Sequence, residues 1–229
     1  MRSTLRLWVH NMITNTNALL KELYRKEQKR LIELSKYRDD GDFLRPVFGE
    51  GSLDAVLMLI GEAPGAEEAE TGRPFVGKAG KQLSDMLACA GIDREAVFIT
   101  NAVKYRPIKF KSARPSNRTP TLLEIKAGAE LLKSEIELIS PKVVATLGNT
   151  PLSAVLDLSE TDKRLTIGSC HGNIKMICIN GKQYQLFPLY HPASTIYNRA
   201  ITDVLKQDLI KLGRIISDLL LKGDNIANE

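Results

Sequence analysis

Four side chains in the sequence could act together on a flat, neutral ligand that forms hydrogen bonds. Phe75, in a loop rich in glycine and proline, could stack on such a ligand. Asn101 carries a carbonyl acceptor and an amide donor side by side, so it can read a matching edge. His191 and the backbone amides of the turn at 61–65 could donate hydrogen bonds to an oxygen that becomes negative, while Glu62 supplies a carboxylate. This set suits a base flipped out of a nucleic acid.

Each of these residues also has an ordinary structural interpretation. Phe75 by itself is more typical of core packing, and Asn101 of a turn or a strand end. A single histidine such as His191 is usually structural, and Glu62 could cap a helix N-terminus. Their positions favour a common site, because they follow segments that we expect to be strands.

The segment at 72–78 also resembles a phosphate-binding loop. Gly72, Gly77 and Lys78 have the spacing G-x-x-x-x-G-K, but Ala79 follows where Ser or Thr would bind Mg²⁺. Acidic residues also separate this segment from the preceding apolar run, and they would repel a triphosphate. We therefore interpret the segment as a turn that presents Phe75 and not as a nucleotide site.

Four apolar segments are typical of buried parallel strands, at 54–61, 96–103, 142–148 and 185–191. Helical patterns are found at 18–37, 78–91, 121–139, 149–158 and 202–220. A hairpin turning at Asn180–Gly181 is expected just before the last strand. The alternation of strands and helices predicts an α/β fold with helices on both faces of a parallel sheet.

Ligands of such folds bind beyond the carboxyl ends of the strands. The loops that follow the segments 54–61, 96–103 and 185–191 should therefore line one crevice. No break rich in proline or glycine divides the chain. We expect a helical N-terminal extension at 1–50, packed on a catalytic domain at 51–229.

Composition is ordinary for a soluble globular protein, with 43% hydrophobic and 26% charged residues. No apolar run is long enough for a membrane span, and the N-terminus lacks the pattern of a secretion signal, so we expect a cytoplasmic protein with no membrane partner. The net charge of +5 slightly favours a polyanionic partner. Three cysteines are too few for a disulfide framework, and Cys170, His171 and Cys178 match no zinc pattern, so no metal site is expected.

Five motifs follow one another along the chain: GEAPGAEEAETGRPFVGKAG, TNAVKYRP, SNRTPTLLEI, SPKVVATLG and YHPAS. In this order they resemble the uracil-DNA glycosylase superfamily, and most closely its family-4 type of bacteria and archaea. The resemblance covers residues 54–212. It implies a three-layer α/β/α sandwich with a central four-stranded parallel sheet. It also implies hydrolysis of the N-glycosidic bond of uracil in DNA, the first step of base-excision repair.

The resemblance also implies a role for each candidate residue. Glu62 would hold or polarise the attacking water, and His191 would stabilise the O2 atom of the departing uracil. Phe75 would stack on uracil, and Asn101 would read its Watson–Crick edge. The other substrate-binding positions would be Gly61, Ala63 and Gly65, through their backbone, and Glu68, which would crowd C5 and disfavour thymine.

Two groups of residues are expected to contact DNA. Lys78 and Lys81 would lie near phosphates, and Pro192, Ala193 and Ser194, with 195–197 after them, would form a loop pressed into the minor groove. The loop at 106–120 is basic, and its candidate DNA-contacting residues are Lys109, Lys111, Arg114 and Arg118. It either grips phosphates or is simply a mobile basic loop.

One departure from the family pattern concerns its four-iron, four-sulfur cluster, which four cysteines hold. Here no cysteine precedes Cys89, the third position is Tyr105, and the fourth falls near Ala127–Gly128. Because thiolates are the ligands of such clusters, we expect no cluster and no other cofactor. We expect a monomer that acts on uracil-containing DNA. The alternatives are a glycosylase for other deaminated bases such as hypoxanthine or xanthine, and a non-catalytic module that binds uracil-containing or single-stranded DNA.

Overall fold

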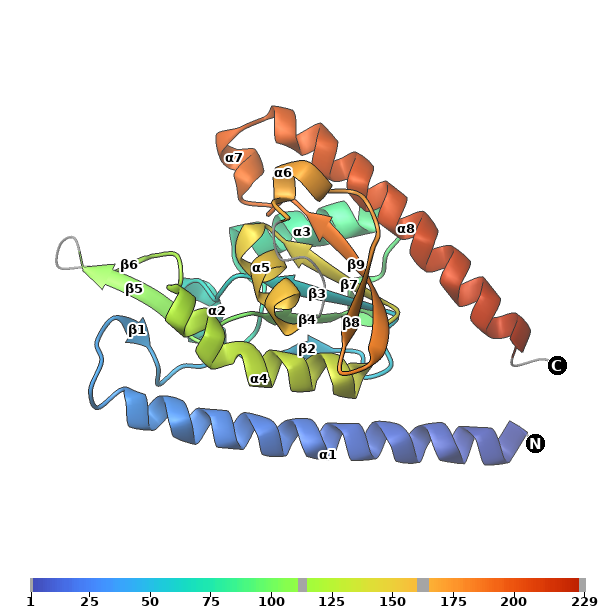
Figure 1. Ribbon diagram of the computed structural model, residues 1–229, viewed down its shortest axis with the longest axis horizontal. Coiled ribbons are helices and arrows are strands. Elements are labelled where there is room, and N and C mark those ends of the chain that lie inside the picture. Colours follow the sequence, from blue (N-terminus) through green and yellow to red (C-terminus); the bar gives the residue numbers. More distant parts are fainter. Residues whose placement is uncertain (1, 111–114, 160–164, 227–229) are drawn as a thin grey trace.

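The computed structural model describes residues 2–110, 115–159 and 165–226. Its main sheet has six strands in the order β2-β4-β3-β7-β9-β8 (Figure 1). These strands are β2 (Glu50–Gly51), β3 (Leu57–Gly61), β4 (Phe98–Asn101), β7 (Val143–Leu147), β8 (Lys175–Ile179) and β9 (Lys182–Leu189). The four expected strands, β3, β4, β7 and β9, pair in parallel, and β2 and β8 add an antiparallel strand at each edge.

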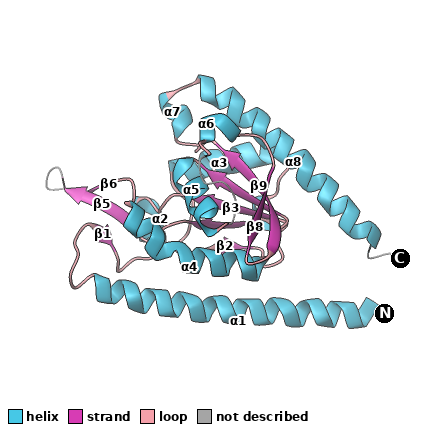
Figure 2. Cartoon of the chain, in the orientation of Figure 1, coloured by secondary structure: helices cyan, strands magenta, loops and turns pink. Residues whose placement is uncertain are grey.

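Helices cover both faces of this sheet, which gives the expected three-layer α/β/α sandwich (Figure 2). Successive side chains of a strand point to opposite faces, so Leu57 and Leu59 pack on one side and Met58 and Ile60 on the other. The first face is covered by α3 (Lys78–Cys89) and α8 (Ala200–Ile226). The second face is covered by α4 (Leu122–Ile139) and α5 (Asn149–Leu158).

Local sequence signals account for where several elements begin and end. Thr121 and Glu124 form a reciprocal capping box at the start of α4. After α3, Gly91 has a φ of 70°, the left-handed conformation that glycine adopts readily. The β8–β9 hairpin turns at Asn180 and Gly181, with φ values of 49° and 73°, as the two-residue turn requires.

The N-terminal helix α1 (Arg2–Leu34) is longer than the expected segment 18–37 at its N-terminal side. It lies along the outer surface of α4 (Figure 1). Leu20 and Leu31 of α1 are buried in the same core cluster as residues of α4 and the sheet. This helix therefore adds an outer layer on one side of the sandwich.

The basic loop at 106–120 forms a β-hairpin in its described part. Strands β5 (Arg106–Phe110) and β6 (Pro115–Asn117) pair with each other, and β5 also pairs with β1 (Gly41–Asp42). The hairpin projects from the body of the molecule (Figure 1). Lys111 and Arg114 lie outside the described residues, whereas Lys109 is described and exposed.

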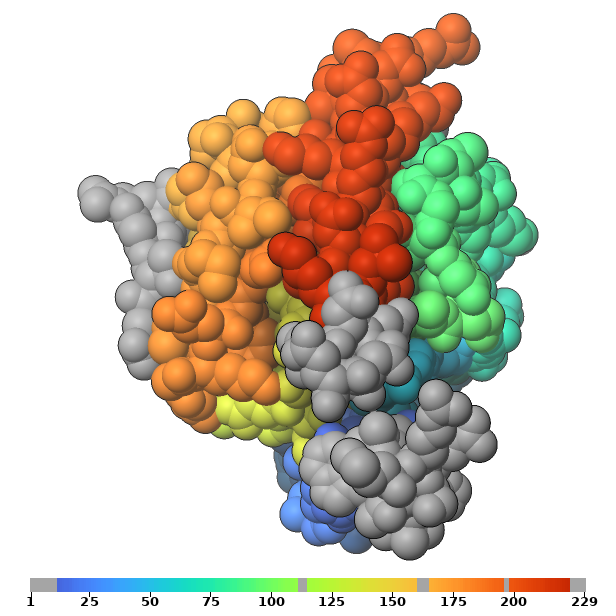
Figure 3. Space-filling view, turned by 90° about the vertical axis from the view of Figure 1, so that its right-hand side faces the viewer, coloured from blue at the N-terminus to red at the C-terminus, as the bar shows by residue number. Residues whose placement is uncertain are grey.

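The described part of the chain also contains four short helices: α2 (Ala66–Thr71), the 3₁₀ turn η1 (Arg94–Ala96), α6 (Ile167–Cys170) and α7 (Ser194–Tyr197). The long α8 closes the fold by packing against α3 and β9, and Figure 3 shows it in red between the green and orange parts of the chain. Within the described ranges, no helix has the length and apolar character needed to cross a membrane.

Candidate active site

A cleft of about 1050 Å³ lies beyond the carboxyl ends of the parallel strands. Glu62 follows β3, Asn101 ends β4 and His191 follows β9, so the topology brings these three residues to the same edge of the sheet, as predicted. Phe75, from the loop between α2 and α3, also lines the cleft. Strand order reverses between β3 and β7, and this switch point is where folds of this class bind their ligands.

Asn101 and Phe75 pack against the backbone of Gly61, in the space that a side chain at residue 61 would occupy. A Cβ atom placed on Gly61 would lie 2.4 Å from Oδ1 of Asn101 and 2.5 Å from Cζ of Phe75. The edge-reading amide and the aromatic ring therefore both reach the space above Gly61. This is the arrangement needed to read one edge of a flat ligand while stacking on its face.

Phe75 is held in a left-handed conformation, with φ of 54°, which is uncommon for a residue with a side chain. Such conformations cost about 1–3 kcal/mol and persist where surrounding contacts enforce them. Arg94 donates hydrogen bonds to the carbonyl oxygens of Pro74 and Phe75, at 3.2 and 3.1 Å. The loop is thus built to aim the ring of Phe75 into the cleft.

The carboxylate of Glu68 supports the same loop from the other side. Its Oε1 accepts hydrogen bonds from the amides of Val76 and Gly77, at 3.1 and 2.8 Å, and its Oε2 accepts one from Gly65 at 3.1 Å. The amide of Gly65 is therefore already engaged by Glu68. Ala63 and Gly65 line the cleft as predicted, and Glu68 lies there as a residue that organises the loop.

His191 lies at the far wall of the cleft, with its ring centroid 6.2 Å from that of Phe75. The backbone N–H of Ala193 donates to its Nδ1 at 3.1 Å, which leaves the proton of a neutral ring on Nε2. Burial lowers the pKa of His191 below its ordinary value, so the ring is neutral at neutral pH. The site therefore offers a neutral N–H donor that is held in place by its own loop.

Glu62 has a partner that the sequence patterns did not single out. The hydroxyl of Thr150 donates a hydrogen bond of 2.5 Å to Oε2 of Glu62. Thr150 lies in the first turn of α5, where the helix dipole stabilises a nearby negative charge. The loop after β7 was the one strand end left out of the predicted crevice, and applying the same strand-end rule to it would have found Thr150.

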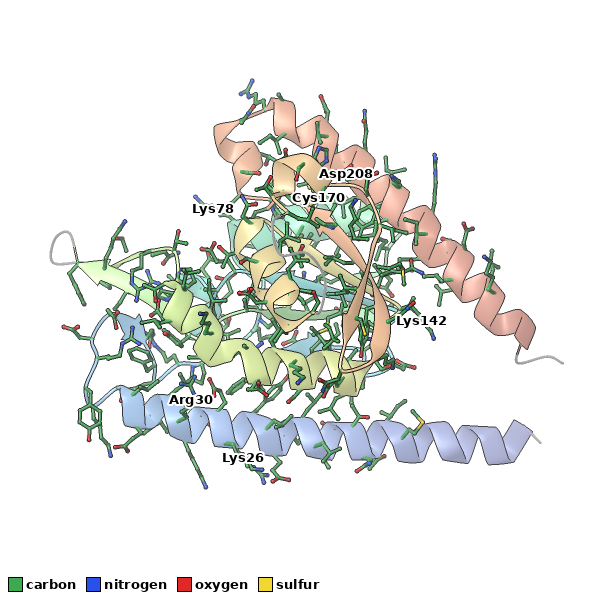
Figure 4. All side chains as sticks on the ribbon, in the orientation of Figure 1. Lys26, Arg30, Lys78, Lys142, Cys170 and Asp208 are labelled. Atoms are coloured by element: carbon green, nitrogen blue, oxygen red, sulfur yellow. The ribbon has the colours of Figure 1, made fainter. Side chains whose placement is uncertain are left out.

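Only some of the residues expected to contact DNA line the cleft. Lys78 is exposed and lines the cleft, on the side of the molecule that carries α7 and the β5–β6 hairpin (Figure 4). Lys81 is exposed one turn later on α3 but does not line the cleft. Ala193 and Ser194 line the cleft, whereas Pro192 is buried within its turn and is not available as a wedge.

Arg118 also lines the cleft, but its guanidinium is already engaged. It forms ion pairs with Glu124, at 2.6 Å, and with Asp40, at 2.9 Å. It also donates to the carbonyl oxygens of Ile108 and Asp40. Arg118 therefore joins the hairpin to α4 and to the segment after α1, and its charge is largely neutralised by these carboxylates.

The positions where the resemblance implies iron-sulfur ligands do not fit a cluster. Tyr105 lies at the third position, where its hydroxyl donates to Glu124 at 2.8 Å and its ring packs 4.5 Å from that of Phe43. At the fourth, a Cβ atom on Gly128 would lie 2.5 Å from the carbonyl oxygen of Ala102, so no thiolate side chain could be accommodated. An ionic and aromatic network occupies this region instead.

Cys170, His171 and Cys178, which match no zinc pattern in the sequence, lie in different surroundings in the structure. Cys170 is buried and Cys178 is partly buried on β8, while His171 bonds to Asp208 of α8 through Nδ1 at 2.7 Å. Cys170 and Asp208 are labelled in Figure 4, near α6 and α8. Within the described part of the chain, no group of three His, Cys, Asp or Glu side chains is arranged to hold a metal ion.

Comparisons with known proteins agree with this geometry. A family model of the Uracil DNA glycosylase superfamily matches residues 48–211. A type-4 uracil-DNA glycosylase of Thermotoga maritima is 42% identical over 154 residues, which are 67% of this chain and 73% of that protein. A type-4 uracil-DNA glycosylase of Saccharolobus solfataricus is 38% identical over 208 residues, or 90% of this chain and 89% of that protein. A type-5 uracil-DNA glycosylase of Pyrobaculum aerophilum is 30% identical over 175 residues, 70% of this chain and 71% of that protein. With its strand-end cleft and this match, the chain belongs to the uracil-DNA glycosylase superfamily.

Proposed function

We propose that the protein hydrolyses the N-glycosidic bond of uracil in DNA. The observation that carries this proposal is that the amide of Asn101 and the ring of Phe75 line one cleft and meet above Gly61. The side-chain amide offers an acceptor and a donor side by side. This pair complements N3–H and O4 of uracil, whereas cytosine presents the opposite pattern at N3 and N4. A base must leave the DNA stack to reach these two side chains in the cleft.

The charges of the site fit the bond cleavage. Breaking the bond produces a uracil anion and an oxocarbenium-like sugar, so catalysis gains most from groups that stabilise these charges as they develop. The Nε2–H of His191 donates to O2 of the leaving uracil. The carboxylate of Glu62, held by Thr150, favours the sugar cation and orients the attacking water.

The test is an excision assay on oligonucleotides that contain uracil, thymine, hypoxanthine or xanthine, in single- and double-stranded form. Formation of an abasic site from uracil is the expected result, and no abasic product from any of these substrates contradicts the proposal. Excision of hypoxanthine or xanthine at a comparable rate supports the broader alternative. Binding to uracil-containing DNA without any excision supports the non-catalytic module. The thymine substrate tests whether Glu68 excludes the C5 methyl group.

A substitution tests the recognition role of Asn101. Asn101→Asp removes the amide donor, so uracil excision should fall while cytosine becomes a better substrate. Asn173→Asp is the matched control, because Asn173 is exposed and does not line the cleft. Unchanged uracil excision by Asn101→Asp removes Asn101 from the recognition role.

We further propose that the protein folds and acts without an iron-sulfur cluster. Support comes from Tyr105 and from the lack of space at Gly128. A purified protein that is colourless and contains no iron is expected, and a brown protein with four iron atoms per chain contradicts the proposal. We expect a monomeric, cytoplasmic enzyme, and light scattering of the purified protein measures its oligomeric state.

A further inference from the structure

A buried lysine lies directly behind the residue that we expect to read the base. The ammonium group of Lys104 donates to the backbone carbonyl of Asn101, to Oγ1 of Thr100 and to Oε2 of Glu135, each at 2.6 Å. The side chains of Lys104 and Glu135 are both 0% exposed. All three N–H donors of the ammonium group are therefore used, and one of them holds the backbone of Asn101.

The same network reaches the N-terminal helix. Glu135 of α4 accepts a hydrogen bond of 2.9 Å from the hydroxyl of Tyr24 on α1. The ring of Tyr24 is stacked on that of Phe48, with centroids 4.4 Å apart and planes inclined by 10°. Burial, together with Glu135, raises the pKa of Tyr24, so its hydroxyl stays protonated and donates. A continuous chain of hydrogen bonds thus runs from α1 through Glu135 and Lys104 to Asn101.

The backbone around Asn101 is held on its other side by β3. The amide of Ala102 donates to the carbonyl of Gly61 at 2.9 Å, and the amide of Val103 donates to that of Glu62 at 3.1 Å. These bonds fix the backbone after Asn101 against β3, and Lys104 holds the carbonyl oxygen of Asn101 itself. Because the side chain of Asn101 is short, a shift of this backbone moves the amide by a similar distance.

Stability alone does not account for a charge buried at this place. Burial lowers the pKa of Lys104, and Glu135 opposes that shift. Replacing a buried ion pair by apolar residues of similar volume is often neutral or stabilising. A buried ion pair is therefore weak evidence for stability, and its contact with the residue that we expect to read the base points to the position it enforces.

We propose that Lys104 is a positioning residue for base recognition, and that α1 takes part in it by holding Glu135 through Tyr24. The inference rests on the proposed function, since it assigns Asn101 to uracil. It gives the N-terminal helix a role in the reaction, although the described residues of that helix do not line the cleft. The alignment with the Saccharolobus solfataricus protein covers 90% of the chain and so includes part of α1.

The test separates position from stability. The triple variant Thr100→Val, Lys104→Met, Glu135→Leu replaces the network by apolar side chains of similar size. We expect a variant that stays folded at the assay temperature, with single-turnover uracil excision reduced by about 10- to 100-fold, since small displacements of a recognition group have such effects. Binding to a duplex with an abasic site, which has no base to read, should not change.

A second variant examines α1 alone. Tyr24→Phe removes one hydroxyl and no other atom, and should reduce excision by about threefold to tenfold, the value of one hydrogen bond. Tyr37→Phe is the matched control, because Tyr37 is 78% exposed and lies beyond the end of α1. Its excision rate should equal that of the wild type.

The outcomes that would overturn the inference are distinct. A folded triple variant that excises uracil at the wild-type rate shows that the network is only structural. If the triple variant fails to fold, the excision rate of Tyr24→Phe tests the inference instead. A rate equal to that of Tyr37→Phe shows that α1 does not take part in base recognition. A wild-type protein that excises no uracil contradicts the proposed function itself. If the wild type is active and the variants excise uracil at the same rate, only this inference is contradicted.

Discussion

The hydroxyl of Thr150 lies 2.5 Å from Oε2 of Glu62 and donates a hydrogen bond to it. The two residues follow β3 and β7, neighbouring strands on either side of the point where strand order reverses. Glu62 has two carboxylate oxygens, and Thr150 engages one of them. In the proposed reaction, the other oxygen would orient water or face the sugar cation.

Thr150→Val is expected to reduce uracil excision by about tenfold, because a hydrogen bond to a charged group contributes about 1.5–3 kcal/mol and its loss frees the carboxylate to rotate. Thr150→Ser keeps the hydroxyl and should retain most of the activity. Single-turnover rates on a uracil-containing duplex measure the difference. Equal rates for the valine and serine variants would contradict this role of Thr150.

The buried ring of His191 should give the excision rate an unusual dependence on pH. Burial lowers the pKa of His191 from its ordinary value of 6.5, so the neutral form persists as the pH falls through 6.5. Below the lowered pKa, a proton on Nδ1 would face the amide of Ala193 and break the contact that holds the ring. The rate should therefore stay constant through pH 6.5 and fall only at lower pH.

A pH–rate profile under single-turnover conditions checks this expectation, with His191→Gln as the comparison. The variant should lose about 100-fold in rate, the usual effect of removing one donor to a developing anion, and should lose the histidine inflection. An inflection at pH 6.5 in the wild type would show that the ring titrates as an ordinary exposed histidine.

Gly61→Ala should displace the two side chains that we expect to bind the base. Its methyl group would lie 2.4 Å from Oδ1 of Asn101 and 2.5 Å from Cζ of Phe75, so one of these groups must move by about an ångström. We expect uracil excision to fall by about 100-fold, with the fold retained because only side-chain ends need to move. Gly168→Ala is the control, since its methyl group would approach only the hydroxyl of Tyr190, at 3.9 Å. Full activity of Gly61→Ala would place the base elsewhere in the cleft.

Protonation of Glu124 should lower the free energy of unfolding at acidic pH. Burial by itself would raise its pKa, but hydrogen bonds from Arg118, the amide of Thr121 and Tyr105 lower the pKa to about 2, from an ordinary value of 4.5. A carboxyl group whose pKa is lower in the folded state stabilises that state at pH values above its ordinary pKa. That contribution, about 3 kcal/mol, is lost as the pH falls from 4.5 towards 2.

Urea unfolding at neutral pH and at about pH 3 measures this loss in the free energy of unfolding. Glu124→Gln should already be less stable at neutral pH and should lose less on acidification. Glu130→Gln on the same helix is the control, because Glu130 is exposed, and it should follow the wild type at both values. If Glu124→Gln and Glu130→Gln lose the same free energy of unfolding on acidification, Glu124 does not cause the acid response.

Short-range patterns were sufficient to predict the α/β architecture and the cleft at the strand ends. The apolar segments at 54–61 and 142–148 contain β3 and β7, and the segment 149–158 coincides with α5. Once the strands are known to be parallel, residues after them must meet at one edge of the sheet, which is why Glu62, Asn101 and His191 were found together. These are consequences of periodicity and of sheet geometry, and both are encoded locally.

The contacts that hold those residues in place were decided by the tertiary structure. The hydroxyl of Thr150 reaches Glu62 across 88 positions, and that of Tyr24 reaches Glu135 across 111. The sequence places Lys104 in the motif TNAVKYRP but does not indicate that its side chain is buried against Glu135 of α4. Residue types and their spacing thus determined which groups face the cleft. Long-range packing decided which neighbours fix them, because a buried polar group must find its partner wherever the fold brings one.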